Sequence, residues 1–131
     1  ASADIDGVTI EADKLQLPQT NNNLVVELAG GLMVPLTKDM LMIHILKQWN
    51  LPVILVSKYY LGSINHTLLS IDMLKAHNIP IKGIIFNGET NLTSKEAILH
   101  YSKVPLLGEI PWMEGDFTKE KVKELGKRLT F

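Results

Sequence analysis

From Leu24 onward, short runs rich in Val, Ile and Leu alternate with helix-like stretches, and this alternation constrains the fold more than any other feature. Strands that alternate with helices are typical of a parallel sheet whose strands are joined by crossover helices. The runs lack polar alternation, which predicts strands buried on both faces of the sheet. We therefore expect an α/β fold with a mostly parallel sheet. The expected strands are residues 24–28, 53–57 and 81–87, with a shorter one near residue 106.

Residues that cap helices well mark the expected helix starts. Thr37 precedes one helix-like stretch, Ser63 precedes a second, and residues 93–96 (Thr-Ser-Lys-Glu) have the form of a capping box. A last helix with mixed charges is expected at about residues 118–128. The helix after Ser63 has apolar residues at spacings of three and four, which predicts one stripe facing the sheet. These apolar residues are Ile64, Leu68, Ile71 and Leu74.

Length, charge and cysteine content limit the classes of protein to which this chain can belong. With 131 residues, 46% of them hydrophobic, the chain can bury one sizeable core, so we expect a single domain over residues 1–131. A net charge of -1 argues against binding to nucleic acid. The absence of cysteine excludes disulfides and thiolate chemistry, and it is consistent with the cytoplasm. The apolar runs are too short to span a bilayer, so we expect no membrane partner.

Ligands bind at the carboxyl ends of the strands in open α/β sheets, so the residues after each expected strand are the candidates for function. Glu27 stands near the end of the first expected strand, and Gly30 and Gly31 follow it, where glycine lets a ligand approach the backbone. The carboxylate suits magnesium, which takes one or two carboxylates together with phosphate oxygens. Alternatively, Glu27 pairs with a lysine and the glycines make a turn.

After the second expected strand, Lys58 and Gly62 lead into the helix that starts near Ser63. The unpaired N–H groups and the positive dipole end of a helix start suit an anion or a carboxylate. Taken singly, each residue also has a plain structural explanation. Ser63 is then an ordinary cap, Asn65 a first-turn residue, His66 a partly buried helix residue and Lys58 a solvated surface charge.

Two further candidates follow the later strands. The side-chain amide of Asn87 can donate to and accept from the edge of a base, although Asn87 and Gly88 together are also typical of a turn. Pro111 and Trp112 follow the last expected strand. The ring of Trp112 either walls an adenine pocket or packs in the core.

Together, these four segments resemble the dethiobiotin synthetase family over nearly the whole chain, most firmly over residues 23–113. The sequence Val26-Glu27-Leu28-Ala29-Gly30-Gly31 resembles the family pattern Val-Glu-Gly-Ala-Gly-Gly. The most specific match is Leu61-Gly62-Ser63-Ile64-Asn65-His66, which is similar to the family's Leu-Gly-x-Ile-Asn-His segment. The sequence Leu107-Gly108-Glu109-Ile110-Pro111 resembles its Leu-Gly-x-Ile-Pro stretch.

The resemblance implies a ligase of biotin biosynthesis with the P-loop nucleotide-binding fold. Such an enzyme closes the ureido ring of dethiobiotin from 7,8-diaminopelargonic acid, carbon dioxide and ATP, and it releases ADP and phosphate. An amine of the substrate forms a carbamate, the γ-phosphoryl group of ATP passes to the carbamate, and the second amine closes the ring. Phosphoryl transfer of this kind depends mainly on positioning and on charge neutralisation.

The resemblance also implies roles for residues of this chain. Glu27 would bind Mg²⁺ and would lie with Leu28, Ala29 and Gly30 against the nucleotide, and Gly30 would also touch the substrate. The family forms homodimers, in which one subunit holds the substrate carboxylate in the site of its partner. The implied contacts with the carboxylate are Gly62, Ser63, Ile64 and Asn65. The implied contacts with adenine are Asn87, Gly88, Pro111, Trp112 and Met113.

The sequence departs from the family pattern in two ways. Leu28 replaces a glycine, which leaves the backbone there less free. The sequence also has no Gly-x-x-x-x-Gly-Lys-Ser/Thr, since its only Gly-Lys pair, Gly126-Lys127, is followed by Arg128. The family's first strand, phosphate loop and catalytic lysine are expected upstream of Ala1. We therefore expect no catalytic residue in these 131 residues, which alone should not transfer phosphate from ATP.

Two alternatives to a synthetase stay open. A ParA/MinD-like P-loop ATPase shares this sheet and would also place an acidic residue at a strand end, but diaminopelargonic acid should not alter its activity. A non-catalytic remnant that kept the dimer surface should be folded, dimeric and unable to bind ATP.

Overall fold

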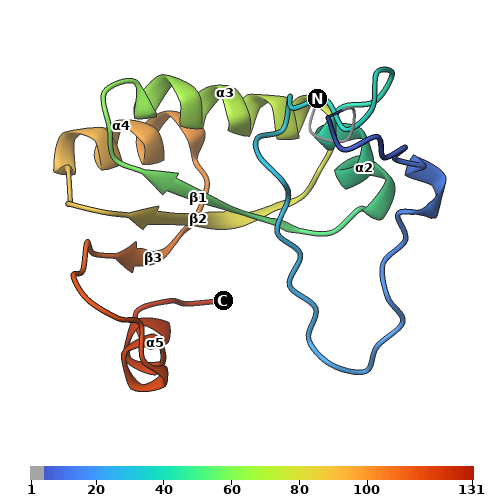
Figure 1. The fold of residues 1–131 in the computed structure, drawn as a ribbon. Coiled ribbons are helices and arrows are strands. Elements are labelled where there is room, and N and C mark those ends of the chain that lie inside the picture. The colour runs from blue at the N-terminus through green and yellow to red at the C-terminus, as the bar shows by residue number, and fades with distance from the viewer. Residues whose placement is uncertain (1–4) are drawn as a thin grey trace. The chain divides into compact units, whose positions relative to one another are not determined.

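The computed structural model describes residues 5–131, which form helices and strands joined by loops (Figure 1). The chain divides into two compact units, Ala1–Leu51 and Pro52–Phe131, and each is described by itself. Residues 1–4 of the expected domain lie outside the described part, and a single domain over the whole chain stays a prediction. Within residues 5–131, every helix is too short or too polar to serve as a membrane span.

The first unit contains α2 (Met42–Trp49) and, earlier in the chain, the 3-10 helix η1 (Ala12–Lys14). One face of α2 is apolar and buried, as in any amphipathic helix that packs against a protein interior. The indole N–H of Trp49 donates to the backbone O of Leu15 at 3.0 Å, which ties the last turn of α2 to the residue after η1. The buried residues of α2 are Met42, Ile43, Ile45 and Leu46.

The helix expected after Thr37 begins later, because Thr37 closes a local turn instead. The hydroxyl of Thr37 accepts a hydrogen bond from the N–H of Asp39 at 3.3 Å, which is the bond that Ser and Thr side chains make in turns. α2 begins after Leu41, whose N–H donates to Nδ1 of His44 at 3.1 Å. The expected start is therefore wrong by about one helical turn.

The strand expected at residues 24–28 is absent from the structure. This segment has no regular secondary structure, and the side chain of Val25 is 92% exposed. A strand is stabilised by hydrogen bonds to a neighbouring strand and by burial of its side chains, and in the described structure this segment has no partner strand. The prediction of a buried strand that carries Glu27 near its end is therefore wrong.

The second unit is a three-stranded parallel sheet in the order β1-β2-β3. The strands are β1 (Val53–Lys58), β2 (Ile81–Asn87) and β3 (Leu106–Ile110). Both crossover helices cover the same face of the sheet (Figure 1), as right-handed connections between neighbouring strands require. The α/β class, the parallel sheet and three of the four expected strands are confirmed. The helices are α3 (Ser63–Ala76), α4 (Leu92–Ser102) and α5 (Lys119–Gly126).

The core of this unit lies between the sheet and the two crossover helices. Ile84 and Phe86 of β2 belong to one buried cluster with Ile71 of α3 and Ile98 of α4. Burial of side chains of this size stabilises a fold by about 1.5–3 kcal/mol each. The expected apolar stripe of α3 is confirmed, because Ile71 is fully buried and Ile64 packs against the cluster.

The two crossover helices are capped by residues other than those expected. Gly62 precedes α3 in a left-handed conformation with a φ of 99°, so Ser63 is the first helical residue rather than the cap. α4 begins after Asn91, whose side chain accepts from the N–H of Ser94 at 2.9 Å. The expected capping box at residues 93–96 therefore lies inside α4. The expected last helix is confirmed, and Thr118 caps α5 by accepting from the N–H of Lys121.

The sequence predicts that β1 is buried on both faces, and this prediction is wrong. β1 lies at one edge of the sheet, and the side chains of Ile54 and Val56 are 37% and 62% exposed. Successive side chains of a strand point to opposite faces, and α3 and α4 cover only one of them. β2 matches the prediction better, since residues 83–86 of this central strand are buried.

Gly108 in β3 lets the C-terminal segment pass close to the sheet. A Cβ at this position would lie 2.3 Å from the backbone O of Arg128, and the φ of Gly108 is 152°. The N–H of Thr130 donates to the O of Leu107 at 2.8 Å. The residues after α5 therefore add a backbone hydrogen bond to β3, and a side chain at position 108 would disrupt this contact.

Candidate functional site

The last residues of the three strands lie side by side at the carboxyl edge of the sheet. Lys58 of β1 pairs in register with Asn87 of β2, and Asn87 pairs with Ile110 of β3. The segments that follow therefore leave the sheet at one edge, which is where open α/β sheets bind ligands. The structure thus brings together three of the four segments that the sequence indicates.

A cavity of about 210 Å³ lies at this edge. Its wall contains a cation, a carboxylate and two aromatic side chains, so it offers both charged and flat surfaces to a ligand. The side chain of Trp112 is 61% exposed, so the alternative that Trp112 packs in the core is wrong. The cavity is lined by Lys58, Tyr59, Gly88, Glu89 and Trp112.

Tyr59 and Glu89 are lining residues that the sequence analysis missed. Each stands directly after a residue that the sequence singles out, Lys58 in one case and Gly88 in the other. Position after a strand end was therefore the signal that could have identified both. The alternative of a plain surface charge for Lys58 is incomplete, because this exposed residue also lines the cavity.

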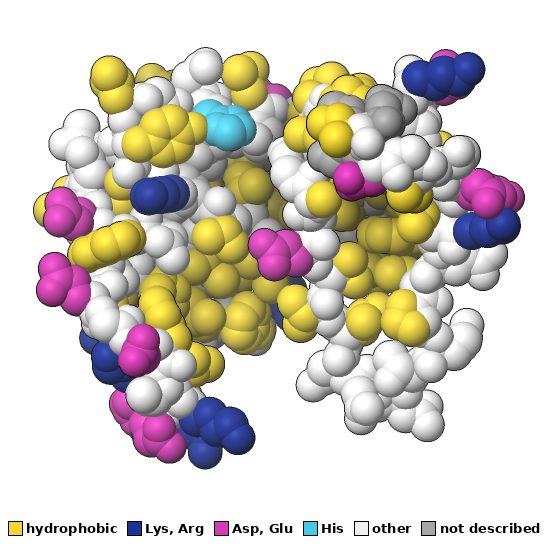
Figure 2. Space-filling view, in the orientation of Figure 1, with side chains coloured by type: hydrophobic (Ala, Val, Ile, Leu, Met, Phe, Trp, Pro, Cys, Tyr) yellow, Lys and Arg dark blue, Asp and Glu magenta, His cyan; other side chains and the backbone are white. Residues whose placement is uncertain are grey.

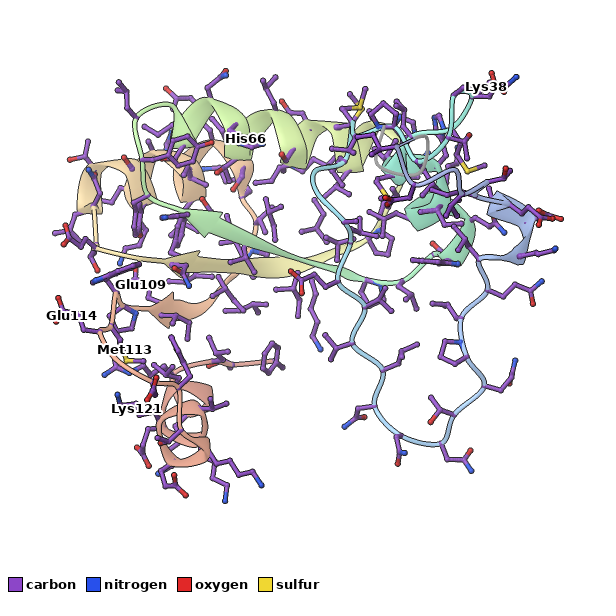
Figure 3. All side chains as sticks on the ribbon, viewed as in Figure 1. Lys38, His66, Glu109, Met113, Glu114 and Lys121 are labelled. Carbon is purple, nitrogen blue, oxygen red and sulfur yellow. The ribbon has the colours of Figure 1, made fainter. Side chains whose placement is uncertain are left out.

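Met113 lines a different cavity, of about 290 Å³, between the loop after β3 and α5. Figure 3 shows Met113 on that loop and Lys121 on the helix below it. Met113 is thus separated from Gly88 and Trp112, although the three were expected to hold one ligand. The other lining residues of this second cavity are Glu120, Lys121, Glu124, Leu125 and Arg128.

Backbone hydrogen bonds hold the three segments together beyond the sheet. The N–H of Tyr59 donates to the O of Asn87 at 3.3 Å, and the N–H of Gly88 donates to the O of Ile110 at 2.9 Å. Gly88 has a φ of 107°, a conformation that glycine adopts without strain. The edge of the site is therefore built from paired backbone and not from free loops.

Glu109, in β3, makes the side-chain contacts that brace this edge. Its Oε1 accepts a hydrogen bond from the hydroxyl of Tyr59 at 3.0 Å and forms an ion pair with Nζ of Lys95 at 3.2 Å. The ring of Tyr59 stacks on Phe86 with the ring centroids 5.2 Å apart. Burial and the hydrogen bond to Glu109 raise the pKa of the Tyr59 hydroxyl far above its ordinary value. Tyr59 therefore stays a neutral donor at physiological pH.

The start of α3 is set by the connection from β1. The N–H of Ser63 donates to the O of Tyr60 at 3.0 Å, and the hydroxyl of Ser57 shares a buried hydrogen bond of 2.8 Å with the hydroxyl of Thr67. Ser63 is buried and Asn65 is exposed. The first N–H groups of any helix lack acceptors within the helix, so this start is chemically suited to a carboxylate.

The sequence predicts a partly buried His66, but this residue is exposed. It lies outside the buried face of α3, which contains Ser63 and Thr67. Its Nδ1 shares a hydrogen bond with the hydroxyl of Tyr60. Figure 2 shows a histidine in cyan next to hydrophobic side chains, at the place where Figure 3 labels His66. His66 therefore braces the same connection from the solvent side.

Glu27 to Gly30 belong to the first unit. That they share a ligand site with the strand ends of the second unit stays a prediction. Glu27 is exposed and makes no ion pair with a described lysine of its own unit. Gly30 has a φ of 100°, and its N–H donates to the O of Leu28 at 3.0 Å. Leu28 has a negative φ, so no glycine is required at that position.

The described part of the chain offers few side chains that could bind a metal ion. No group of three or more His, Asp or Glu side chains within residues 5–131 is arranged to hold a cation. Magnesium in nucleotide enzymes needs only one or two protein carboxylates, because water and phosphate oxygens complete its coordination. The exposed carboxylate of Glu27 fits this limited requirement.

Residues 1–118 match the family model described as AAA domain. The chain belongs to this AAA domain family. The match covers the first unit and all three strands of the sheet and ends before α5, and it agrees with the parallel α/β fold of a P-loop nucleotide-binding domain.

Curated relatives of the chain are named ATP-dependent dethiobiotin synthetase BioD. A protein from Rhodopseudomonas palustris is 49% identical over 110 residues, covering 84% of this chain and 52% of that protein. A protein from Bradyrhizobium diazoefficiens is 48% identical over 86% of this chain and 54% of its own length. A protein from Christiangramia forsetii is 43% identical over 98% of this chain and 63% of its own length. The resemblance to dethiobiotin synthetase is therefore confirmed, and the chain spans about half the length of the relatives that it matches.

Proposed function

We propose that the complete protein that contains these residues is an ATP-dependent dethiobiotin synthetase. The observation that carries this proposal is the alignment of Lys58, Asn87 and Ile110 at one edge of the sheet, in a chain 41–49% identical to proteins of that name. The reaction is closure of the ureido ring of 7,8-diaminopelargonic acid with carbon dioxide, driven by ATP. The proposed location is the cytoplasm.

The cavity at the strand ends is the proposed site for the base of ATP. Gly88 lines this cavity, directly after Asn87 at the end of β2, and Trp112 offers an exposed ring on which a flat base can stack. Pro111 precedes Trp112 and would complete the contact, whereas Met113, which lines the second cavity, would have to turn toward the base to join it. The amide of Asn87 supplies both a donor and an acceptor for the edge of the base.

The proposed role of Glu27 is to bind Mg²⁺, with Leu28, Ala29 and Gly30 next to the phosphates. The metal ion, when bound, neutralises charge on the phosphate oxygens. The residues of this chain supply one carboxylate and, at Gly30, a backbone without a side chain of its own, next to the side chain of Val34. Gly30 would touch the substrate as well.

The start of α3 is the proposed site for the substrate carboxylate. Gly62 caps this helix, and Ser63, Ile64 and Asn65 are its first residues. The N–H of Ser63 donates to Tyr60, so the N–H groups of Ile64 and Asn65 and the helix dipole would favour an anion. We place this site opposite the nucleotide site of a partner subunit, which requires a homodimer.

The phosphate loop needed for this reaction is not among these residues, because the sequence contains no Gly-x-x-x-x-Gly-Lys-Ser/Thr. The activity is therefore proposed for the complete gene product and not for the 131 residues alone. Residues outside this chain would have to supply the loop and the catalytic lysine.

The test is an assay of the purified complete gene product with diaminopelargonic acid, bicarbonate and MgATP. Dethiobiotin, detected by mass spectrometry, should form together with ADP and phosphate, and omission of any one reactant should stop the reaction. ATP hydrolysis that ignores diaminopelargonic acid would contradict the proposal and favour the ParA/MinD-like alternative. A folded dimer that does not bind ATP would favour the non-catalytic alternative.

A further inference from the structure

The carboxylate of Glu109 joins three segments of the second unit. Tyr59 lies in the connection from β1 to α3, Lys95 lies in α4, and both contact Oε1 of Glu109, at 3.0 and 3.2 Å. Figure 3 shows Glu109 at the end of β3, next to the loop that carries Met113 and Glu114. The side chains of Lys95 and Glu109 are only 20% and 30% exposed, so water and salt screen this ion pair less than a surface pair.

The residues proposed to hold ligands follow closely on these segments. Gly62 caps α3 three residues after Tyr59, and Pro111 lies two residues after Glu109. Tyr59 cannot turn away freely, because its ring stacks on Phe86. A displacement of the Glu109 side chain would therefore shift Tyr59 and, with it, the start of α3. It would also shift the loop after β3, which follows Glu109 in the sequence.

Glu109 does not line the cavity at the strand ends, so it would act through its neighbours and not on a ligand. Its contacts differ from the backbone bonds at this edge, which tie Tyr59 to Asn87 and Gly88 to Ile110. Those bonds join strand ends to their neighbours only. The side chain of Glu109 is the contact that also reaches α4.

We propose that Glu109 is a positioning residue that fixes the adenine contacts after β3 relative to the carboxylate-binding start of α3. This inference rests on the proposed function, from which it takes the two ligand sites. In the proposed homodimer the start of α3 serves the partner's site. Glu109 therefore links the nucleotide site of one subunit to the substrate site of the other.

The first test compares KM values of the complete enzyme. Glu109→Ala removes both contacts and should raise the KM for ATP and the KM for diaminopelargonic acid about 10-fold each, as expected for loss of hydrogen bonds to a charged group. Tyr59→Phe keeps the ring that lines the cavity and stacks on Phe86, and it removes only the hydrogen bond to Glu109. It should raise the KM for diaminopelargonic acid about 5-fold, more than it raises the KM for ATP. Glu109→Gln can still accept from Tyr59 and should restore most of the affinity for diaminopelargonic acid.

Two matched variants on α4 serve as controls. Tyr101→Phe and Glu96→Gln make the same chemical changes on exposed side chains that line neither cavity, and neither should change a KM value. A Glu109→Ala enzyme with a lower unfolding midpoint and unchanged KM values would show a merely structural role. That result would overturn the proposal.

The second test needs no ligand and separates this inference from the proposed function. The N–H groups of Ser63 and Gly88 donate to Tyr60 and Ile110, so their hydrogen exchange reports the order of the two segments. Glu109→Ala should speed exchange at both by about 5-fold or more, and Tyr59→Phe should do so at Ser63 only. Unchanged exchange at both positions would overturn the positioning role even in an active enzyme. Faster exchange in a protein that makes no dethiobiotin would support the link and contradict the proposed function.

Discussion

Residues 24–28 and β1 carry similar apolar runs, but only β1 forms a strand. β1 pairs with β2 along its length, and its Ser57 is hydrogen-bonded to Thr67 of α3. Residues 24–28 have no partner strand in the described structure, and their Val25 is almost fully exposed. An apolar run thus becomes a strand only where a neighbour satisfies its backbone groups and a helix covers its side chains.

Truncation of core side chains should give the largest difference between the two regions. Ile84→Ala, in β2, removes a fully buried side chain and should lower the free energy of unfolding by about 2–5 kcal/mol. Val25→Ala, in the first unit, removes an exposed side chain and should change it by less than about 0.5 kcal/mol. Urea unfolding monitored by circular dichroism measures both. A cost above about 1 kcal/mol for Val25→Ala would show that residues 24–28 are packed after all.

For activity, residues 24–28 should matter more than they do for stability, because Glu27 in this segment is the proposed metal ligand. Glu27→Gln in the complete enzyme should lower turnover about 100-fold or more, since a metal ion supplies several kcal/mol of charge stabilisation in phosphoryl transfer. Titration of activity with MgCl₂ is the measurement. Glu11→Gln, at an exposed residue of the same unit, is the matched control. Near-normal turnover of Glu27→Gln at saturating magnesium would remove Glu27 from the site.

Glycine substitutions compare backbone packing in the two units. Gly108→Ala places a Cβ against the backbone O of Arg128 and should destabilise the protein by about 1–3 kcal/mol. Gly31→Ala meets no atom within 4 Å and has no positive φ, so it should be neutral or stabilise by about 0.4–1 kcal/mol. Thermal unfolding of the two variants decides. Equal stability would mean that the C-terminal segment does not pack against β3.

The smallest expected effect concerns the start of α3. Asn65→Ala in the complete enzyme should raise the KM for diaminopelargonic acid about 10-fold and leave the KM for ATP within about 2-fold, because the exposed Asn65 is proposed to touch only the substrate. Steady-state kinetics with each substrate varied in turn tests this. Asn21→Ala is the matched control on an exposed residue of the first unit. Equal increases in both KM values would argue against a carboxylate site at this helix.

Strands and helix faces of the second unit could be predicted because they depend on neighbours along the chain. The run at residues 81–87 is apolar throughout and becomes the central strand, and Ile71 lies on the expected stripe of α3. Helix starts were less predictable. Ser63 and Thr37 are both good capping residues, yet Gly62 caps α3 and Thr37 closes a turn. The choice depends on the backbone conformation with which the chain enters the helix, which residue type alone does not determine.

The candidate site was predictable to the extent that strand ends converge in a parallel sheet. Asn87, Gly88 and Trp112 were expected there from their positions after the strands, and Gly88 and Trp112 line one cavity. The second cavity, with Met113, depends on where α5 folds back, and no local pattern contains that information.

The sequence by itself determined the α/β class, three of the strands, the apolar stripe of α3 and the family resemblance, because each rests on the order of nearby residues. The tertiary structure alone decided that residues 24–28 have no partner strand within residues 5–131 and that β1 is an edge strand. It also decided that Tyr59 and Glu109, 50 residues apart in the chain, share a hydrogen bond. The reason is physical: such contacts depend on distances between segments that meet only after the sheet has formed, and periodicity along the chain does not encode those distances.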